Sequence, residues 1–115
     1  MSFTPEEMDR IVGGIRAGYV VTIGGSRCNT SYRANEAGEL VIEHFDEGHV
    51  DAHPFSEDEL RRVIRDSPRD EFVGVMRAPL KDALRAAIFN GVETSDFTPA
   101  TRCFEDLAKY GYDSL

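Results

Sequence analysis

Long hydrophobic runs are absent from this sequence: no apolar stretch approaches the roughly 18 residues that a helix needs to cross a bilayer. The sequence therefore excludes a helical membrane protein. Cysteine is also scarce, because Cys28 and Cys103 are the only two and they lie too far apart to indicate a disulfide framework. No signal peptide is evident, so we predict a cytoplasmic protein with two reduced thiols; a single disulfide is the alternative.

Basic residues are missing from one long segment, residues 34–60, which contains neither lysine nor arginine. The segment holds nine acidic residues and all three histidines. Its charge is −9, and the rest of the chain has a net charge of +1, which gives −8 for the whole chain. Such a surface repels phosphate backbones and anionic lipid heads. The sequence therefore argues against direct binding of nucleic acid or membranes, and it favours a basic protein surface, a metal ion or water.

The 115 residues, 41% hydrophobic and 30% charged, are enough for a single folded domain spanning residues 1–115. The chain begins with a strong helix-start pattern, in which Thr4 caps, Pro5 occupies the first turn and Glu7 completes a capping box. Gly13 and Gly14 each lower the helix propensity by up to about 1 kcal/mol. Either another part of the chain packs closely against them or the helix is weak there.

Four segments with β-branched or alternating residues follow the first helix, and they predict strands at residues 19–23, 29–34, 39–46 and 49–55. Their connections are too short for parallel crossovers, so the strands form an antiparallel meander. Glu47-Gly48 fits a two-residue hairpin loop between the last two strands.

The second half of the chain is mostly helical in pattern. Ser56 and Glu59 form a second capping box, residues 80–88 carry an apolar helical stripe, and Thr98-Pro99 opens a last helix. Residues 72–76 suit either a buried strand or a short helix, and we favour the helix. The whole pattern predicts an α+β fold: an N-terminal helix, an antiparallel meander of three to four strands, then three to four helices packed on one face.

The predicted hairpin places histidines and carboxylates together. A turn at Glu47-Gly48 puts one set of side chains on one face of the sheet: His44, Asp46, His49, Asp51 and His53. The opposite face, which we expect to be the core side, carries Val41, Phe45, Val50 and Ala52. Imidazoles and carboxylates on one surface can bind a transition metal, with His44, His49 and His53 as candidate ligands. The alternative is a solvated sheet face, because no close-spaced metal motif supports the cluster.

The acidity of the segment has a partly local explanation. Residues 57–59 lie in the first turn of a helix, where the helix dipole favours carboxylates. Four carboxylates in the hairpin lack such an explanation: Glu43, Asp46, Glu47 and Asp51. They serve either as a docking surface for a basic partner or as charges that protect an edge from aggregation.

Three further features carry less chemistry. Gly24-Gly25-Ser26-Arg27 lacks the following helix and the lysine of a phosphate-binding loop, so we interpret it as a turn. Cys28 lies beside Arg27, but no cysteine–histidine signature marks it as a nucleophile. The arginines of residues 61–69 form a basic strip, which could meet the acidic hairpin of a second copy in a salt-sensitive homodimer.

We therefore predict a small acidic protein-binding module, of the inhibitor, immunity or adaptor type, that presents its hairpin to a basic partner surface. No convincing catalytic constellation is present, which argues against an enzyme, and no cofactor is predicted. The alternative is a small ligand- or metal-binding domain, or an enzyme, that uses the histidine-rich sheet face. A pocket lined by the three histidines would favour that alternative, whereas a flat acidic face would favour docking.

Overall fold

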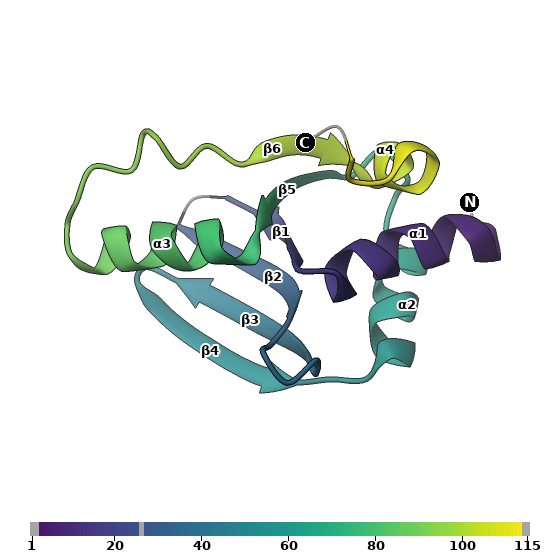
Figure 1. Ribbon diagram of the computed structural model, residues 1–115, viewed down its shortest axis with the longest axis horizontal. Coiled ribbons are helices and arrows are strands. Elements are labelled where there is room, and N and C mark those ends of the chain that lie inside the picture. The colour runs from purple at the N-terminus through teal and green to yellow at the C-terminus, as the bar shows by residue number, and fades with distance from the viewer. Residues whose placement is uncertain (1–2, 26, 114–115) are drawn as a thin grey trace.

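The computed structural model describes residues 3–25 and 27–113 (Figure 1). The elements of this part are, in order, α1 (Pro5–Arg16), β1 (Tyr19–Gly24), β2 (Cys28–Ala34), β3 (Leu40–Asp46), β4 (His49–Pro54), α2 (Glu57–Asp66), β5 (Phe72–Arg77), α3 (Ala78–Phe89), β6 (Ala100–Cys103) and α4 (Phe104–Tyr110). The strands form one antiparallel sheet in the order β4-β3-β2-β1-β5-β6. The α+β class and the antiparallel meander are therefore confirmed.

The sheet is larger than predicted, with six strands in place of three to four. Residues 72–76 belong to the strand β5 and not to a short helix, and the last helix begins at Phe104 because residues 100–103 form β6. The error at β5 has a physical cause. This strand lies inside the sheet with Val73, Val75 and Met76 all buried. A strand covered on both faces lacks alternation, so its pattern resembles that of a buried helix.

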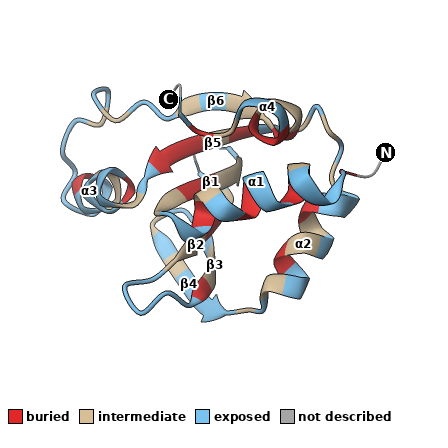
Figure 2. Ribbon diagram, turned by 45° about the vertical axis from the view of Figure 1, so that its right-hand side comes forward, coloured by how far each residue is buried: buried red, intermediate tan, exposed pale blue. Residues whose placement is uncertain are grey.

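The main core lies between one face of the sheet and the helices α1, α2 and α4. Figure 2 shows the buried residues gathered where these helices face the strands. The helices contribute Ile11, Ile15, Leu60, Ile64, Phe104 and Leu107, which pack against Val21, Tyr32, Val73 and Val75 of the sheet. Both predicted capping boxes are present, at Thr4 and at Ser56. They fix the first turns of α1 and α2 against this core.

The helix α3 packs on the opposite face, so the prediction that the helices share one face is wrong. Its Lys81 reaches Thr22, whose neighbour Val21 points into the main core. The prediction that Val41, Phe45, Val50 and Ala52 face the main core is also wrong. Phe45 is buried on the α3 face, but the main core continues along the other face, where Leu40 and Ile42 precede the histidines.

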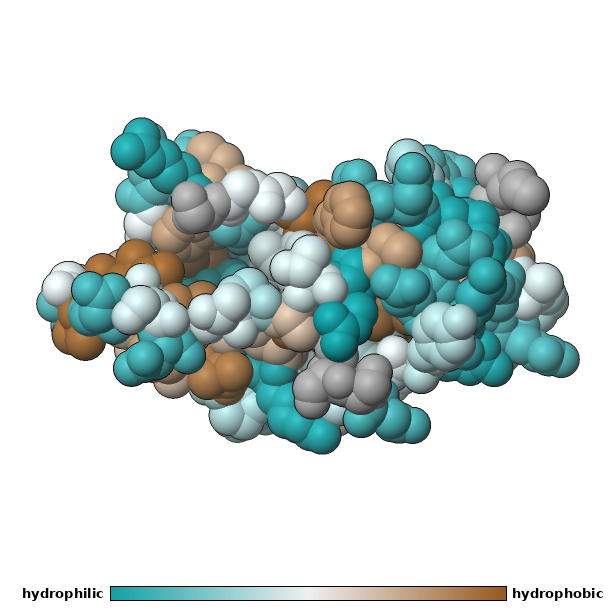
Figure 3. Space-filling model, turned by 90° about the horizontal axis from the view of Figure 1, so that it is seen from above, coloured by the Kyte–Doolittle hydropathy of each residue, from teal (hydrophilic) through white to brown (hydrophobic). Residues whose placement is uncertain are grey.

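The two faces of the sheet differ in how completely they are covered. Three helices close one face, whereas α3 alone covers the other (Figure 1). Seen from above, apolar atoms gather at the left-hand end, over α3 and the segment after it, while the other end is mostly hydrophilic (Figure 3). The exposed large hydrophobic residues of α3 and of the segment after it are Leu80, Ile88, Phe89 and Val92. Within the described residues, no helix has the length and apolar character needed to cross a membrane.

Candidate functional site

The β3–β4 hairpin has the predicted register. Asp46 pairs with His49, Phe45 with Val50, and the intervening turn is Glu47-Gly48. Both turn residues have positive φ, 48° at Glu47 and 93° at Gly48, as a tight turn matched to the twist of the strands requires. The backbone N–H of Glu47 also donates to the carbonyl oxygen of Arg27, at 2.9 Å. The hairpin turn is therefore hydrogen-bonded to the loop between β1 and β2.

The three histidines lie on one face, as predicted, but they do not converge on a single point. The rings of His44 and His53 are 5.6 Å apart between centroids, and His49 Nε2 instead lies 3.5 Å from Asp51 Oδ1. All three are exposed, and His44 Nδ1 is 3.2 Å from the hydroxyl of Thr30. Nowhere in the described part of the chain do three or more histidine, cysteine or acidic side chains lie in reach of one metal ion.

Three of the four candidate docking carboxylates are exposed at the hairpin tip: Asp46, Glu47 and Asp51. None of them forms an ion pair with a lysine or arginine of the described residues. Asp46 Oδ1 accepts a hydrogen bond from Cys28 Sγ at 3.2 Å, and this bond raises the pKa of the Cys28 thiol. Both cysteines are free, but the carboxylate beside Cys28 disfavours the thiolate that a nucleophile requires.

Glu43, the fourth candidate, lies on the other face of the sheet. Its carboxylate accepts from Arg85 Nη1 at 2.7 Å and lies 3.9 Å from Arg33. With only 12% of its side chain exposed, it belongs to an internal ion-pair cluster beneath α3, which continues from Arg33 to Asp82 at 2.6 Å. Glu43 therefore does not contribute to the exposed acidic surface.

The basic strip of residues 61–69 is largely neutralised within the chain. Its ion pairs are Arg61–Asp9, Arg61–Glu57, Arg65–Asp66 and Arg69–Glu7. The Arg69 guanidinium lowers the pKa of Glu7 to about 2, with the backbone hydrogen bond from Thr4 as a second cause. The strip thus offers less free positive charge to the hairpin of a second copy than the sequence indicates.

A cavity of about 370 Å³, which the sequence did not predict, lies between α3 and the sheet. The buried Lys81 and the largely buried Arg85 line it, together with Thr22 and Asn29. One feature of the sequence could have indicated this cavity: Lys81 and Arg85 are cations four residues apart, so they lie on one face of a largely apolar helix. Which face of the sheet that helix covers was not evident from the sequence.

The chain was compared with protein families, curated proteins and solved structures. No protein family, no curated protein and no solved structure matches the chain significantly.

Proposed function

We propose that the protein is a binding module that presents the tip of its β3–β4 hairpin to a basic surface of a partner protein, in the manner of an inhibitor, immunity or adaptor protein. The observation that carries the proposal is the concentration of exposed carboxylates at one tight turn. Asp46, Glu47 and Asp51 face solvent there, and within the described part of the chain none of them has a lysine or arginine partner.

The backbone of the turn supports the same proposal. Glu47 adopts a left-handed conformation, with φ of 48°, which disfavours residues other than glycine, asparagine and aspartate. A glutamate at this position reduces the stability of the turn but adds a charge at its outermost point. Unfavourable backbone conformations of this kind concentrate at functional sites.

The shape of the surface suits a protein partner better than a small ligand. The three cavities that stand out among the described residues contain no histidine and no residue of the turn. An exposed surface with uncompensated charge increases the association rate and selects partners of opposite charge. A metal bound by His44, His49 and His53 stays a prediction, which calorimetry with zinc tests directly.

Charge reversal at the tip tests the docking proposal. The triple variant Asp46→Lys, Glu47→Lys, Asp51→Lys is used as bait in a pull-down from the native host, beside the unchanged protein. We expect the variant to lose the captured partner, and we expect capture by the unchanged protein to weaken as salt rises, since exposed charges are screened.

A matched control carries Glu36→Lys, Glu39→Lys and Asp58→Lys. These three residues are exposed, lie near the other end of the hairpin strands and form no ion pair within the described residues. The control changes the net charge equally, so we expect it to retain the partner. Undiminished capture by the tip variant contradicts the proposal. If neither variant captures a partner, and the tip variant aggregates while the control stays soluble, the result would instead indicate that the tip carboxylates protect the sheet edge from aggregation.

A further inference from the structure

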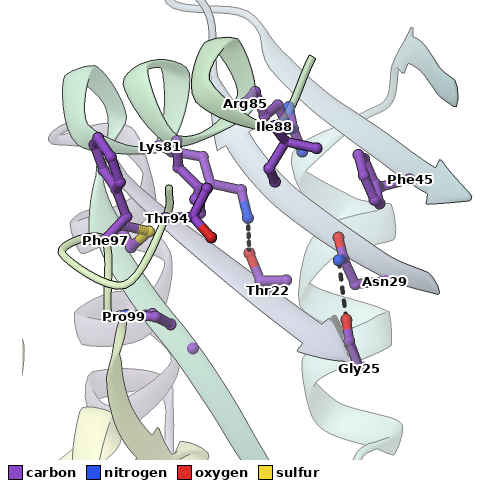
Figure 4. A pocket seen from close by; sticks show the side chains of 14 residues that line it. Thr22, Gly25, Asn29, Phe45, Lys81, Arg85, Ile88, Thr94, Phe97 and Pro99 are labelled. Atoms are coloured by element: carbon purple, nitrogen blue, oxygen red, sulfur yellow. Dashed lines mark hydrogen bonds between the residues drawn. The ribbon is translucent and has the colours of Figure 1, made fainter. Parts of the chain in front are cut away.

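The cavity beneath α3 is a second feature with chemical content, separate from the tip of the hairpin (Figure 4). It lies between α3, the sheet face opposite the main core and the segment that leads to β6. Most of its wall is apolar and comes from Phe45, Met76, Leu84, Ile88, Phe97 and Pro99. A volume of about 370 Å³ falls within the range of small-molecule sites.

One wall of this cavity carries a buried ammonium group. Lys81 is 7% exposed, and its Nζ donates to Thr22 Oγ1 at 3.2 Å (Figure 4). Thr22 Oγ1 in turn lies 2.8 Å from the hydroxyl of the fully buried Ser31. No carboxylate of the described residues forms an ion pair with Lys81. Burial lowers the pKa of Lys81, and the nearby charge of Arg85 lowers it further.

Two other residues of the cavity wall have buried polar atoms without a partner in the described part of the chain. Arg85 uses Nη1 for Glu43, but its Nη2 is buried and unpaired. Asn29 donates from its amide nitrogen to the carbonyl of Gly25, at 3.0 Å, but its Oδ1 is buried and unpaired. Such atoms are rare in folded proteins, and each indicates a missing partner. Arg85 lacks an acceptor, and Asn29 lacks a donor.

The charges around the cavity leave one positive charge in excess. Among the described residues, Lys81, Arg85 and Arg33 face two carboxylates, those of Glu43 and Asp82. This local excess stands in a chain whose net charge is −8. Water can satisfy a single unpaired atom, but it does not neutralise a buried ammonium. A bound anion both satisfies the unpaired atom of Arg85 and neutralises the ammonium of Lys81.

We propose that this cavity binds a small carboxylic acid with an apolar body. The carboxylate pairs with the Lys81 ammonium and accepts from Arg85, while the body contacts the apolar wall formed by Phe45, Leu84 and Ile88. A single excess positive charge fits a monoanion better than a phosphate dianion. Asn29 Oδ1 accepts from a hydroxyl or N–H group where the ligand carries one.

Three probes of equal chain length test the proposal: octanoate, 1-octanol and octylamine. Each is titrated into the full chain, and binding is followed by calorimetry and by backbone amide shifts in NMR spectra. We expect octanoate to bind at one saturable site, 1-octanol to bind about tenfold more weakly because it lacks the charge, and octylamine to show no binding at the site. Shifts from octanoate should be centred on Gly74, Ile88 and Phe97, which line the cavity.

The variant Lys81→Met removes the ammonium and retains the length of the side chain. Because no ion pair is broken, we expect the variant to fold. It should lose at least about tenfold in octanoate affinity and keep its affinity for 1-octanol. The control is Lys109→Met, at the only other lysine, which is exposed on α4 and pairs with Glu105. Its octanoate affinity should equal that of the unchanged protein.

Several outcomes would overturn the proposal. Octylamine binding as tightly as octanoate would show that the cavity does not select an anion. If the Lys81→Met variant bound octanoate as tightly as the unchanged protein, Lys81 would not be part of the binding site. Amide shifts confined to the α1 and α4 side of the sheet, or no saturable shift up to ~10 mM octanoate, would show that the cavity is not the binding site. The wild-type spectra decide these last points even if the variant does not fold.

Discussion

At the scale of single residues, Gly13 and Gly14 are neighbours in α1 with opposite surroundings. A Cβ on Gly13 meets no atom within 4 Å, whereas a Cβ on Gly14 overlaps the ring of Tyr112. The ring cannot easily withdraw, because its hydroxyl donates to the carbonyl of Ile11 at 2.9 Å and it stacks on Tyr19 with centroids 4.7 Å apart. Only Gly14 is therefore required by packing.

Two alanine substitutions should separate these roles. Gly13→Ala should raise the free energy of unfolding by about 0.5–1 kcal/mol, because alanine favours the helix and nothing obstructs its methyl group. Gly14→Ala should lower it by about 1–3 kcal/mol, because the Tyr112 ring must shift. Urea denaturation of both variants measures the two changes. Changes of the same sign would show that the close approach of Tyr112 is wrong.

A second prediction at this scale concerns Glu7, whose pKa falls from 4.5 to about 2 mainly through its hydrogen bond with Arg69. Because the pKa is lower in the folded state, the ion pair stabilises the fold above about pH 4.5, and this contribution is lost as the pH falls from 4.5 to about 2. Glu7→Gln should therefore be less stable than the unchanged protein at neutral pH, and the difference should shrink towards pH 2.

Melting temperatures measured across this pH range test the sign. Glutamine retains an oxygen that can accept from the Thr4 N–H, so the helix cap is preserved. The control is Glu6→Gln, at an exposed residue that forms no ion pair within the described part. A difference between Glu7→Gln and the unchanged protein that stays constant with pH would contradict the role given to Arg69.

At the scale of elements, the turn of the β3–β4 hairpin combines Glu47 and Gly48, both at positive φ. Asparagine tolerates this conformation better than glutamate, so Glu47→Asn should raise the free energy of unfolding by about 0.5–1 kcal/mol. The control Glu36→Asn removes the same charge at a residue without positive φ, and no such gain is expected there. Chemical denaturation compares the two, and an equal gain would assign the effect to charge alone.

The elements also differ in how far the sequence could predict them. The meander and both capping boxes were predictable because their signals are local, namely alternation, short turns and the Thr4–Glu7 and Ser56–Glu59 spacings. The strand β5 was not predicted as a strand, because both its faces are covered and its sequence lacks alternation. The strand β6 has only four residues, lies at the edge of the sheet and is defined by its pairing with β5. Such long-range pairing leaves little trace in local sequence.

The same distinction applies to the candidate site. A two-residue turn fixes the register, so the shared face of His44, Asp46, His49, Asp51 and His53 was predictable. The position of Glu43 and the cavity beside Lys81 were not, because both depend on which face of the sheet α3 covers.

At the scale of the whole molecule, the sheet separates two surfaces of opposite electrostatic character. The hairpin tip presents carboxylates to solvent, while the cavity beneath α3 encloses an excess of positive charge. The two proposed sites therefore select partners of opposite sign. Variants at the hairpin tip and at Lys81 can be studied separately, since Asp46 and Asp51 lie on the face of the sheet opposite Lys81.

The central position of β1 has a consequence for how the chain assembles. Its pairing with β2 joins Thr22 to Ser31, nine residues apart, whereas its pairing with β5 joins Thr22 to Gly74. The second pairing closes a loop of roughly fifty residues, and the entropic cost of closure grows with loop length. Contacts between distant segments also slow folding. β1 is thus the strand at which a meander that closes by short loops meets the strands of the second half, which join the sheet through this long-range pairing.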